Sequence, residues 1–221
     1  MHTYSVDNNE RVKIIFGIVI VSYFLTILIN HLLGLGINLI SKIDFIDNII
    51  SKIEFIGVDI RQITLFAVFG LIYNIFDKKL WKTALFQKIC VKIPNLNGEW
   101  EGEFESNYNG NTKGKVTFKI EQTWTKIKIV SENEKSDSYS RVAGILLNTN
   151  KGINIVYQYE NRTNEKSSDG MNDHRGYSDL IYKNKIIDGK NVEVLEGDYT
   201  GDQINRKAAG YIHYKKIKGE N

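Results

Sequence analysis

The sequence predicts a mostly β soluble domain, an eight-stranded antiparallel barrel, preceded by two transmembrane α-helices. Three observations support this fold class: a long uncharged apolar segment near the N-terminus, a shorter one after it, and a change from helical to alternating periodicity at Pro94. We therefore divide the 221-residue chain into residues 1–93, a membrane hairpin with a juxtamembrane amphipathic helix, and residues 94–221, the barrel.

The two apolar segments differ in length. Residues 14–40 form a run of 27 without Asp, Glu, Lys or Arg, and about 20 apolar residues suffice for a helix to cross a bilayer core. Residues 62–76 number only 15, which span about 22 Å as a helix. Arg61 could complete this second span by extending its charged end to the lipid headgroups. The alternative for residues 62–76 is a buried amphipathic helix.

Basic residues flank both predicted spans on the same side. Arg11 and Lys13 precede the first span, and five lysines follow the second. The excess of positive charge on cytoplasmic flanks therefore predicts that both termini are cytoplasmic. Among those lysines, Leu80, Trp81 and Leu85 recur at helical spacing, which predicts a helix lying on the inner leaflet.

Charge and cysteine content exclude several classes of function. Residues 94–221 carry 19 basic and 19 acidic side chains, whereas binding to a DNA or RNA duplex rests on an excess of Lys and Arg. The single cysteine, Cys90, cannot form an intramolecular disulfide, and four scattered histidines give no ligand set for zinc. We therefore expect no duplex partner and no metal.

Residues beyond Pro94 alternate as half-buried strands do. Trp100 and Phe104 alternate with glutamates, so one face of the first strand is apolar and the other acidic. Eight such sequential strands predict an up-and-down, lipocalin-like barrel, or else a sandwich; a closed barrel of this size holds side chains or one small ligand. The predicted strands cover residues 98–105, 115–120, 126–129, 138–147, 153–159, 175–182, 192–200 and 208–217.

The alternation also predicts what lines the interior. If Trp100 and Phe104 face inward, the later strands place several tyrosines inside the barrel. Buried phenolic hydroxyls need hydrogen-bond partners, so such a cluster implies either an aromatic core with satisfied hydroxyls or a polar ligand. The inward tyrosines are Tyr157, Tyr159, Tyr199 and Tyr214.

Catalytic motifs are absent from the sequence. There is no Gly-rich phosphate loop, no HExxH and no Gly-x-Ser-x-Gly, and the glutamates at 99, 101, 103 and 105 alternate with the core face as a solvated wall would. We therefore expect that the protein is not an enzyme and needs no cofactor.

Several short motifs together resemble one family of effectors. They begin with Ile93-Pro94-Asn95-Leu96-Asn97-Gly98-Glu99-Trp100-Glu101-Gly102 behind the two spans. The others are Ser138-x-Ser140-x-x-Ala143-x-Ile145, Tyr157-x-Tyr159-x-Asn161, His174-x-Gly176, and Leu195-Glu196-Gly197-x-Tyr199-Thr200 followed by Arg206 and Gly210. In this order they resemble the two-transmembrane, β-barrel effectors of bacterial CBASS antiphage systems, which work with a CD-NTase enzyme.

The resemblance implies a function for the whole chain. A CD-NTase activated by phage would make a 3′,3′-linked cyclic dinucleotide, and the cytosolic barrel would bind it. The protein would then form a homo-oligomer in the inner membrane and disrupt the lipid bilayer, killing the infected cell before phage release. In this sequence, residues 201–205 separate Thr200 from Arg206 by more residues than the family pattern has.

The chemistry of a cyclic dinucleotide selects candidate residues. Its two phosphodiesters need cationic or hydroxyl donors, for which Arg175 and Lys207 are further candidates. Its bases need aromatic stacking partners, to which Trp124 could also contribute, and the resemblance implies a role for His174. The predicted ligand-binding residues are Arg141, Tyr157, Tyr159, His174, Tyr199, Thr200 and Arg206.

A second function of a different class is a membrane-tethered, lipocalin-like carrier of a lipid or other apolar ligand. An interior made wholly of aliphatic side chains would favour the carrier, whereas tyrosine and arginine in the later strands favour the nucleotide receptor.

Overall fold

The computed structural model describes residues 1–40, 64–107, 112–132, 136–163, 173–203 and 206–218. The chain divides into two compact units. One joins Met1–Asn8 to Ala84–Asn221, and the other is Asn9–Thr83. The first eight residues therefore belong to the same unit as the β-rich part, although the sequence placed them with the membrane hairpin.

The helical unit contains α1 (Glu10–Ile40), α3 (Leu65–Lys78) and a 3₁₀ turn, η1 (Leu80–Lys82). Among the described residues, one helix is long and apolar enough to cross a membrane, over Glu10–Leu35. This finding is compatible with membrane association, and a crossing by the 14-residue α3 stays a prediction. The predicted juxtamembrane helix is interrupted, because the extended backbone of Thr83 separates η1 from α4 (Ala84–Ile89).

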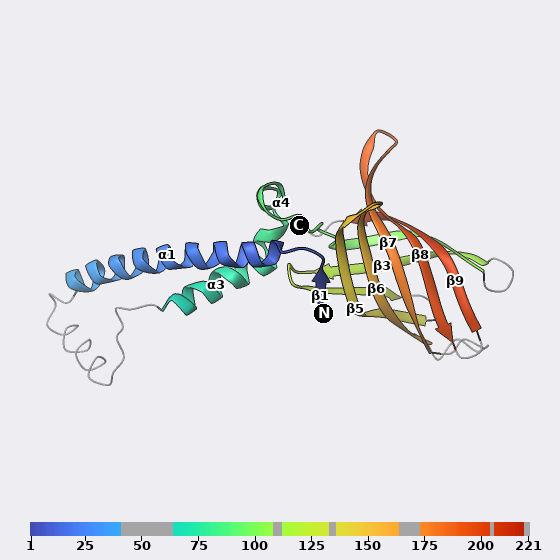
Figure 1. Ribbon diagram of the computed structural model, residues 1–221, viewed down its shortest axis with the longest axis horizontal. Coiled ribbons are helices and arrows are strands. Elements are labelled where there is room, and N and C mark those ends of the chain that lie inside the picture. The colour runs from blue at the N-terminus through green and yellow to red at the C-terminus, as the bar shows by residue number, and fades with distance from the viewer. Residues whose placement is uncertain (41–63, 108–111, 133–135, 164–172, 204–205, 219–221) are drawn as a thin grey trace. The chain divides into compact units, whose positions relative to one another are not determined.

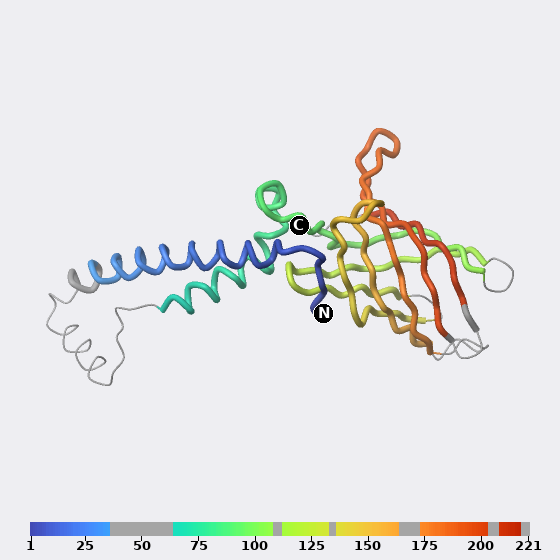
Figure 2. Tube along the Cα trace, in the orientation of Figure 1, coloured from blue at the N-terminus to red at the C-terminus, as the bar shows by residue number. Residues whose placement is uncertain are grey.

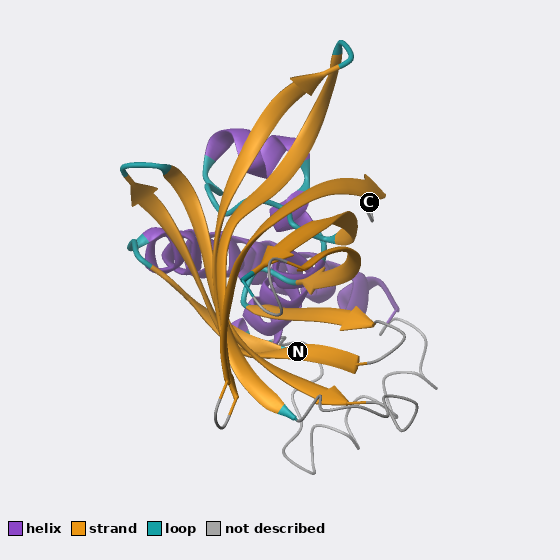
Figure 3. Cartoon of the chain, turned by 90° about the vertical axis from the view of Figure 1, so that its right-hand side faces the viewer, coloured by secondary structure: helices purple, strands orange, loops and turns teal. Residues whose placement is uncertain are grey.

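The β-rich unit is one sheet whose strand order closes on itself as a barrel (Figures 1 and 3). Consecutive strands from β2 to β9 pair in antiparallel fashion, and β9 pairs with β2. The eight strands of the second half of the chain are β2 (Gly98–Ser106), β3 (Thr112–Gln122), β4 (Lys126–Glu132), β5 (Ser136–Thr149), β6 (Gly152–Thr163), β7 (His174–Ile187), β8 (Lys190–Gln203) and β9 (Arg206–Lys218).

A ninth strand, which the sequence analysis missed, comes from the extreme N-terminus. β1 (His2–Val6) lies between β4 and β5, antiparallel to β4 and parallel to β5 (Figure 2). The sheet described here therefore has nine strands rather than eight, and it is not wholly antiparallel. Five polar and apolar residues ahead of a long apolar helix carry too short a pattern to predict a strand.

One half of the barrel is filled by its own side chains. This half lies at the end where β3 turns into β4 and β5 into β6. The Trp100 indole N–H donates to the Leu96 carbonyl at 3.0 Å, and Trp124 at the β3–β4 turn is fully buried. Trp124 therefore belongs to this core, and it is not among the pocket residues described below. The fully buried core side chains include Leu96, Trp100, Ile120, Trp124, Ile127, Ile145, Ile155 and Leu195.

The outer wall of β2 is charged, as the alternation predicted. Glu99, Glu103 and Glu105 are exposed, and each lies opposite a lysine of β3 in the strand register. Glu105 forms an ion pair with Lys113. Water screens both charges of such exposed pairs, so this wall adds little to the stability of the barrel.

A polar pocket in the open half of the barrel

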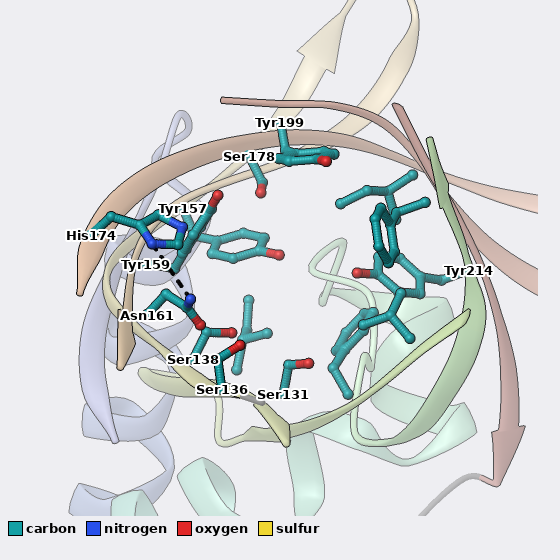
Figure 4. A pocket seen from close by; sticks show the side chains of 15 residues that line it. Ser131, Ser136, Ser138, Tyr157, Tyr159, Asn161, His174, Ser178, Tyr199 and Tyr214 are labelled. Carbon is teal, nitrogen blue, oxygen red and sulfur yellow. Dashed lines mark hydrogen bonds between the residues drawn. The ribbon is translucent and has the colours of Figure 1, made fainter. Parts of the chain in front are cut away.

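The other half of the barrel encloses a pocket of about 220 Å³ (Figure 4). It lies toward the end where β2, β4, β6 and β8 finish, and side chains from all eight of the strands β2 to β9 line it. The lining residues are Phe104, Val116, Phe118, Ile129, Ser131, Ser136, Ser138, Tyr157, Tyr159, Asn161, His174, Ser178, Tyr199, Ile212 and Tyr214.

The two sides of the pocket differ in chemistry. Strands β2, β3 and β9 contribute mainly apolar side chains, such as Phe118 and Ile212. Strands β4 to β8 contribute hydroxyls, an amide and an imidazole, and in Figure 4 the oxygens of Tyr157, Ser178 and Tyr214 point into the space. The pocket therefore suits a ligand with both flat apolar surfaces and polar edges.

Glycines on neighbouring strands make room for the aromatic rings. Tyr159 lies opposite Gly176 in the register, and Tyr199 lies opposite Gly210. A Cβ atom on Gly176 would come within 2.1 Å of the Tyr159 ring, and one on Gly210 within 2.6 Å of the Tyr199 ring. Each ring therefore occupies the space that a side chain at the paired glycine would fill.

The tyrosines of the pocket are neutral hydrogen-bond donors. Burial raises the pKa of Tyr157, Tyr159, Tyr199 and Tyr214 above the ordinary value for a phenol. The hydroxyl of Tyr159 donates to the Thr200 carbonyl at 3.2 Å. At neutral pH these phenols therefore carry no negative charge, and since Tyr159 uses its O–H for the Thr200 carbonyl, the O–H groups that can face a ligand belong to the other tyrosines.

Ser178 carries a buried hydroxyl that lacks a hydrogen bond. The residue is 1% exposed and lies opposite Tyr157 in the register. Its Oγ is close enough to the Tyr157 phenol to oppose part of the rise in that pKa, but the pair does not reach hydrogen-bond geometry. A buried hydroxyl without a partner costs about 1–3 kcal/mol, so a polar group of a ligand would relieve this cost.

His174 and Asn161 close the pocket on the β6–β7 side. They face each other in the register, with 3.5 Å between the Asn161 amide nitrogen and Nδ1 of His174 (Figure 4). The imidazole also packs edge-on against the Tyr159 ring, with 6.3 Å between centroids. Asn161 is 8% exposed, so its amide is a buried group able to donate to and accept from a nucleobase edge.

The structure brings together four of the seven predicted site residues. Tyr157, Tyr159, His174 and Tyr199 all line the pocket. Thr200 lies on the exposed outer face, and only its main-chain carbonyl reaches a pocket residue. Arg141 is also on the outer face.

Arg141 forms an exposed ion pair instead of lining the pocket. Its guanidinium donates to the Glu160 carboxylate at 2.7 Å, and Arg162 donates to the same carboxylate. The hydrogen bond from Tyr139, followed by that from Arg162 and the charge of Arg141, lowers the pKa of Glu160 against the opposing effect of burial. Arg206 begins β9, where its backbone pairs with Gln203, and its side chain lies outside the described part of the chain.

Five polar residues of the pocket were not predicted as site residues. The alternation that placed Tyr157 and Tyr159 inside extends by one step to Asn161, and Ser178 has the same parity as the buried Leu180. Serine side chains are small and uncharged, so the sequence alone does not indicate that they contact a ligand. The five are Ser131, Ser136, Ser138, Asn161 and Ser178.

The donor set does not suit a metal. Among the described residues, no group of three or more His, Cys, Asp or Glu side chains could hold a metal ion. The pocket instead presents neutral hydroxyls, one amide and one imidazole next to aromatic faces.

These features define a β-barrel domain with a polar, aromatic pocket, and comparison with known proteins identifies the family. A family model described as Cap15, cyclic dinucleotide receptor domain, matches residues 91–216, which is more than half of the chain. The chain belongs to this family, which confirms the resemblance to CBASS effectors.

Two curated relatives support the same assignment. CD-NTase-associated protein 15 of Yersinia aleksiciae is 30% identical over 112 residues, which cover 50% of this chain and 52% of that protein. CD-NTase-associated protein 15 of Escherichia albertii is 27% identical over 148 residues, covering 64% and 73%. The match thus spans about half of the Yersinia relative and nearly three quarters of the Escherichia one.

Proposed function

We propose that this protein is a CBASS effector in which a cyclic dinucleotide, made by a partner CD-NTase, binds the barrel pocket and triggers oligomerisation and disruption of the bacterial inner membrane. The observation that carries the proposal is the pocket itself: aromatic faces and buried hydroxyls at one end of a barrel of this family. The candidate membrane helix near the N-terminus supplies the membrane attachment.

The volume of the pocket suggests how the ligand is seated. Sites for drug-sized ligands usually enclose about 300–1,000 Å³, whereas this pocket measures about 220 Å³. We infer that one base and its sugar enter between the tyrosine rings, while the phosphodiesters lie nearer the mouth. The second nucleoside then remains at the mouth of the pocket, and different residues contact the two halves of the ligand.

The roles of the lining residues follow from their chemistry. Tyr159 and Tyr199 provide stacking surfaces, each worth about 1–3 kcal/mol per base. Asn161 and Ser178 provide edge contacts, and the phenols of Tyr157 and Tyr214 donate to polar atoms of the ligand. No Lys or Arg is present among the fifteen described lining residues, so the positive charge for the phosphates is proposed to come from Arg206 at the mouth.

The carrier function is less well supported by this pocket. Ten of the fifteen lining side chains bear a hydroxyl, amide or imidazole group, and an apolar cargo would give the hydrogen-bonding atoms that face the pocket no partner. A cyclic dinucleotide offers acceptors and donors for them. The same reasoning gives no role to Arg141, which lies outside the pocket.

The membrane arrangement extends the same proposal. α1 and the segment that includes α3 form a two-span hairpin, and both termini lie on the cytoplasmic side because the basic flanks favour it. The barrel would then meet a messenger made in the cytoplasm. No catalytic step is required of this chain.

The test uses the full-length protein in detergent micelles and in dye-loaded liposomes of phosphatidylethanolamine and phosphatidylglycerol. One or more 3′,3′-linked cyclic dinucleotides should raise the melting temperature in micelles and release dye from liposomes. Tyr159→Ala should abolish both responses. Tyr177→Ala is the matched control, because Tyr177 is a 48% exposed tyrosine on the neighbouring strand β7.

Each result bears on one part of the proposal. Stabilisation by fatty acids but by none of the cyclic dinucleotides would establish the carrier instead. Binding without dye release would retain the receptor and reject membrane disruption. Equal loss of binding in Tyr159→Ala and Tyr177→Ala would show that the ligand does not occupy this pocket.

A further inference from the structure

The N-terminal strand β1 fills a gap in the wall of the ligand pocket's barrel. β4 and β5 pair directly only through Val130 with Tyr139, Ser131 with Ser138, and Glu132 with Asp137. Beyond these three pairs the two strands separate, and β1 takes the place between them. The wall is continuous only while β1 is docked.

The N-terminal end of β1 meets the pocket wall at Ser140. The Ser140 hydroxyl accepts a hydrogen bond from the Ile129 amide at 3.0 Å, at the point where the β4–β5 ladder stops. The same oxygen lies 2.8 Å from Nε2 of His2 in β1. Ile129 lines the pocket, as does Ser138, two residues before Ser140 on the same face. One hydroxyl thus joins β4, β5 and β1 beside the ligand site.

β1 is held by few side chains. Within the five-residue strand, only Tyr4 is buried, and its hydroxyl donates to the Trp124 carbonyl at 2.8 Å. Thr3 and Ser5 are exposed. Just after the strand, the Asp7 carboxylate accepts a hydrogen bond from the Leu147 amide at 2.8 Å. A short segment with little buried apolar surface opens at lower free-energy cost than the rest of a domain.

β1 is also continuous with the candidate membrane helix. Only Asp7, Asn8 and Asn9 separate the end of β1 at Val6 from the start of α1 at Glu10. Three residues span at most about 10 Å when fully extended. The connection between β1 and the first turn of α1 is therefore short.

We propose that β1 is a releasable strand that couples the pocket to the membrane helix: it is docked between β4 and β5 in the unliganded protein, and ligand binding frees it. The inference rests on the proposed function for its ligand. A ligand that contacts Ile129 and Ser138 changes the spacing of β4 and β5 at Ser140, where β1 is attached. Loss of the His2 contact leaves β1 attached through Tyr4, Asp7 and its main-chain pairing, and release of β1 frees the start of α1.

The test is a disulfide between β1 and β5 on the outer face of the barrel. Ser5 lies opposite Gly144 in the parallel register, and a Cβ atom on Gly144 would lie 2.9 Å from the Ser5 hydroxyl oxygen. Cysteines at these two positions are therefore within disulfide reach. The double variant Ser5→Cys/Gly144→Cys is made in full-length protein with Cys90→Ser, which removes the exposed native thiol.

The first readout is the rate at which the disulfide forms in micelles, with and without the cyclic dinucleotide that gives the largest thermal shift. We expect rapid formation without ligand and a several-fold slower reaction with it. A rate that is unchanged or increased, in samples whose thermal shift proves binding, would overturn the proposal. Absence of any thermal shift would instead reject the proposed function and, with it, this inference.

The second readout is dye release from liposomes. The oxidised double variant should keep its thermal shift but release little dye, and dithiothreitol should restore release. Each single-cysteine variant should behave as the Cys90→Ser parent does under both conditions. Full ligand-dependent release from the oxidised protein would show that β1 need not move.

Discussion

The phenol ring of Tyr159 on β6 lies directly over Gly176 on β7, its register partner. The ring carbon that bears the hydroxyl would be only 2.1 Å from a Cβ atom on that glycine. The hydroxyl then reaches the main-chain carbonyl of Thr200 on β8. Three neighbouring strands thus fix one aromatic face of the pocket, and the glycine in the motif His174-x-Gly176 is explained by the ring that covers it.

Gly176→Ala should disturb this face. The added methyl group meets both the Tyr159 ring and the Thr200 carbonyl, 2.4 Å away, and overpacking of this kind costs about 1–3 kcal/mol. We expect a lower free energy of unfolding in urea and weaker binding of the cyclic dinucleotide in isothermal titration. Tyr159→Phe keeps the ring and should retain most of the affinity. Normal stability and normal binding in Gly176→Ala would mean that the ring is free to move aside.

Ser178→Ala should weaken ligand binding without lowering the stability of the protein. Because the Ser178 hydroxyl is buried without a hydrogen bond, its removal should leave the unliganded protein as stable or more stable, by up to about 1 kcal/mol. Ligand affinity should fall about five- to tenfold, the equivalent of one hydrogen bond. Urea unfolding and titration calorimetry measure the two effects.

Ser131→Ala is the matched comparison for that variant. Its hydroxyl already donates to the Thr117 carbonyl at 2.9 Å, so the same truncation should lower the stability of the unliganded protein by about 1 kcal/mol. If Ser178→Ala were destabilising to the same degree, the Ser178 hydroxyl would have a partner in the protein and would not await a ligand.

Glu196 on the outer face should make stability depend on pH in acid. Hydrogen bonds from Lys183 and Lys185 lower its pKa from 4.5 to about 2, against the opposing effect of burial. Because the folded-state pKa is depressed, the stabilisation is complete above about pH 4.5 and is lost as the pH falls toward 2. Both lysines are partly exposed, so solvent screening limits the effect to about 2 kcal/mol.

Glu196→Gln tests this dependence. Urea unfolding at several pH values should show a lower stability than the native protein near neutrality and a flatter decline between pH 4.5 and 2. His213 also contacts this carboxylate, at 3.1 Å, so His213→Gln is measured in parallel to separate its contribution. Parallel pH profiles for native protein and Glu196→Gln would show that other carboxylates govern the acid response.

Arg141→Gln should leave ligand binding unchanged. The sequence made Arg141 a candidate for holding phosphate, but its guanidinium pairs with Glu160 on the outer face, where it is half exposed. The substitution should leave the free energy of unfolding nearly unchanged, because water screens this exposed ion pair. A large fall in affinity, with normal stability, would mean that Arg141 turns toward the ligand.

Arg206→Gln, by contrast, should weaken ligand binding and reduce the dependence of the affinity on salt concentration.

The chain's period-two pattern was sufficient to predict the eight strands of the second half and the inward position of four tyrosines. Alternation is a local property, because successive side chains of a strand point to opposite faces whatever the strand pairs with. Parity counted from Trp100 and Phe104 therefore carried through to Tyr157, Tyr159, Tyr199 and Tyr214. The long apolar helix could also be predicted, because the length of an apolar segment determines whether it can span a bilayer.

Arg141 shows where a local pattern stops being sufficient. If the alternation is counted forward from the inward-facing Ser140, Arg141 faces outward. If it is counted backward from the buried Ala143, Arg141 faces inward. A register shift between Ser140 and Val142 reconciles the two. Such a bulge depends on how β5 pairs with β6, and the strand's own sequence does not reveal it.

The sequence by itself determined the order of strands, the apolar helix and the chemistry of the inward side chains. Only the tertiary structure decided that the N-terminus supplies a ninth strand, that one half of the barrel is filled and the other open, and that serines complete the ligand site. The physical reason is that these features arise from pairing and packing between segments far apart in the chain. His2 and Ser140 meet across 138 residues of sequence, a separation that no periodicity records.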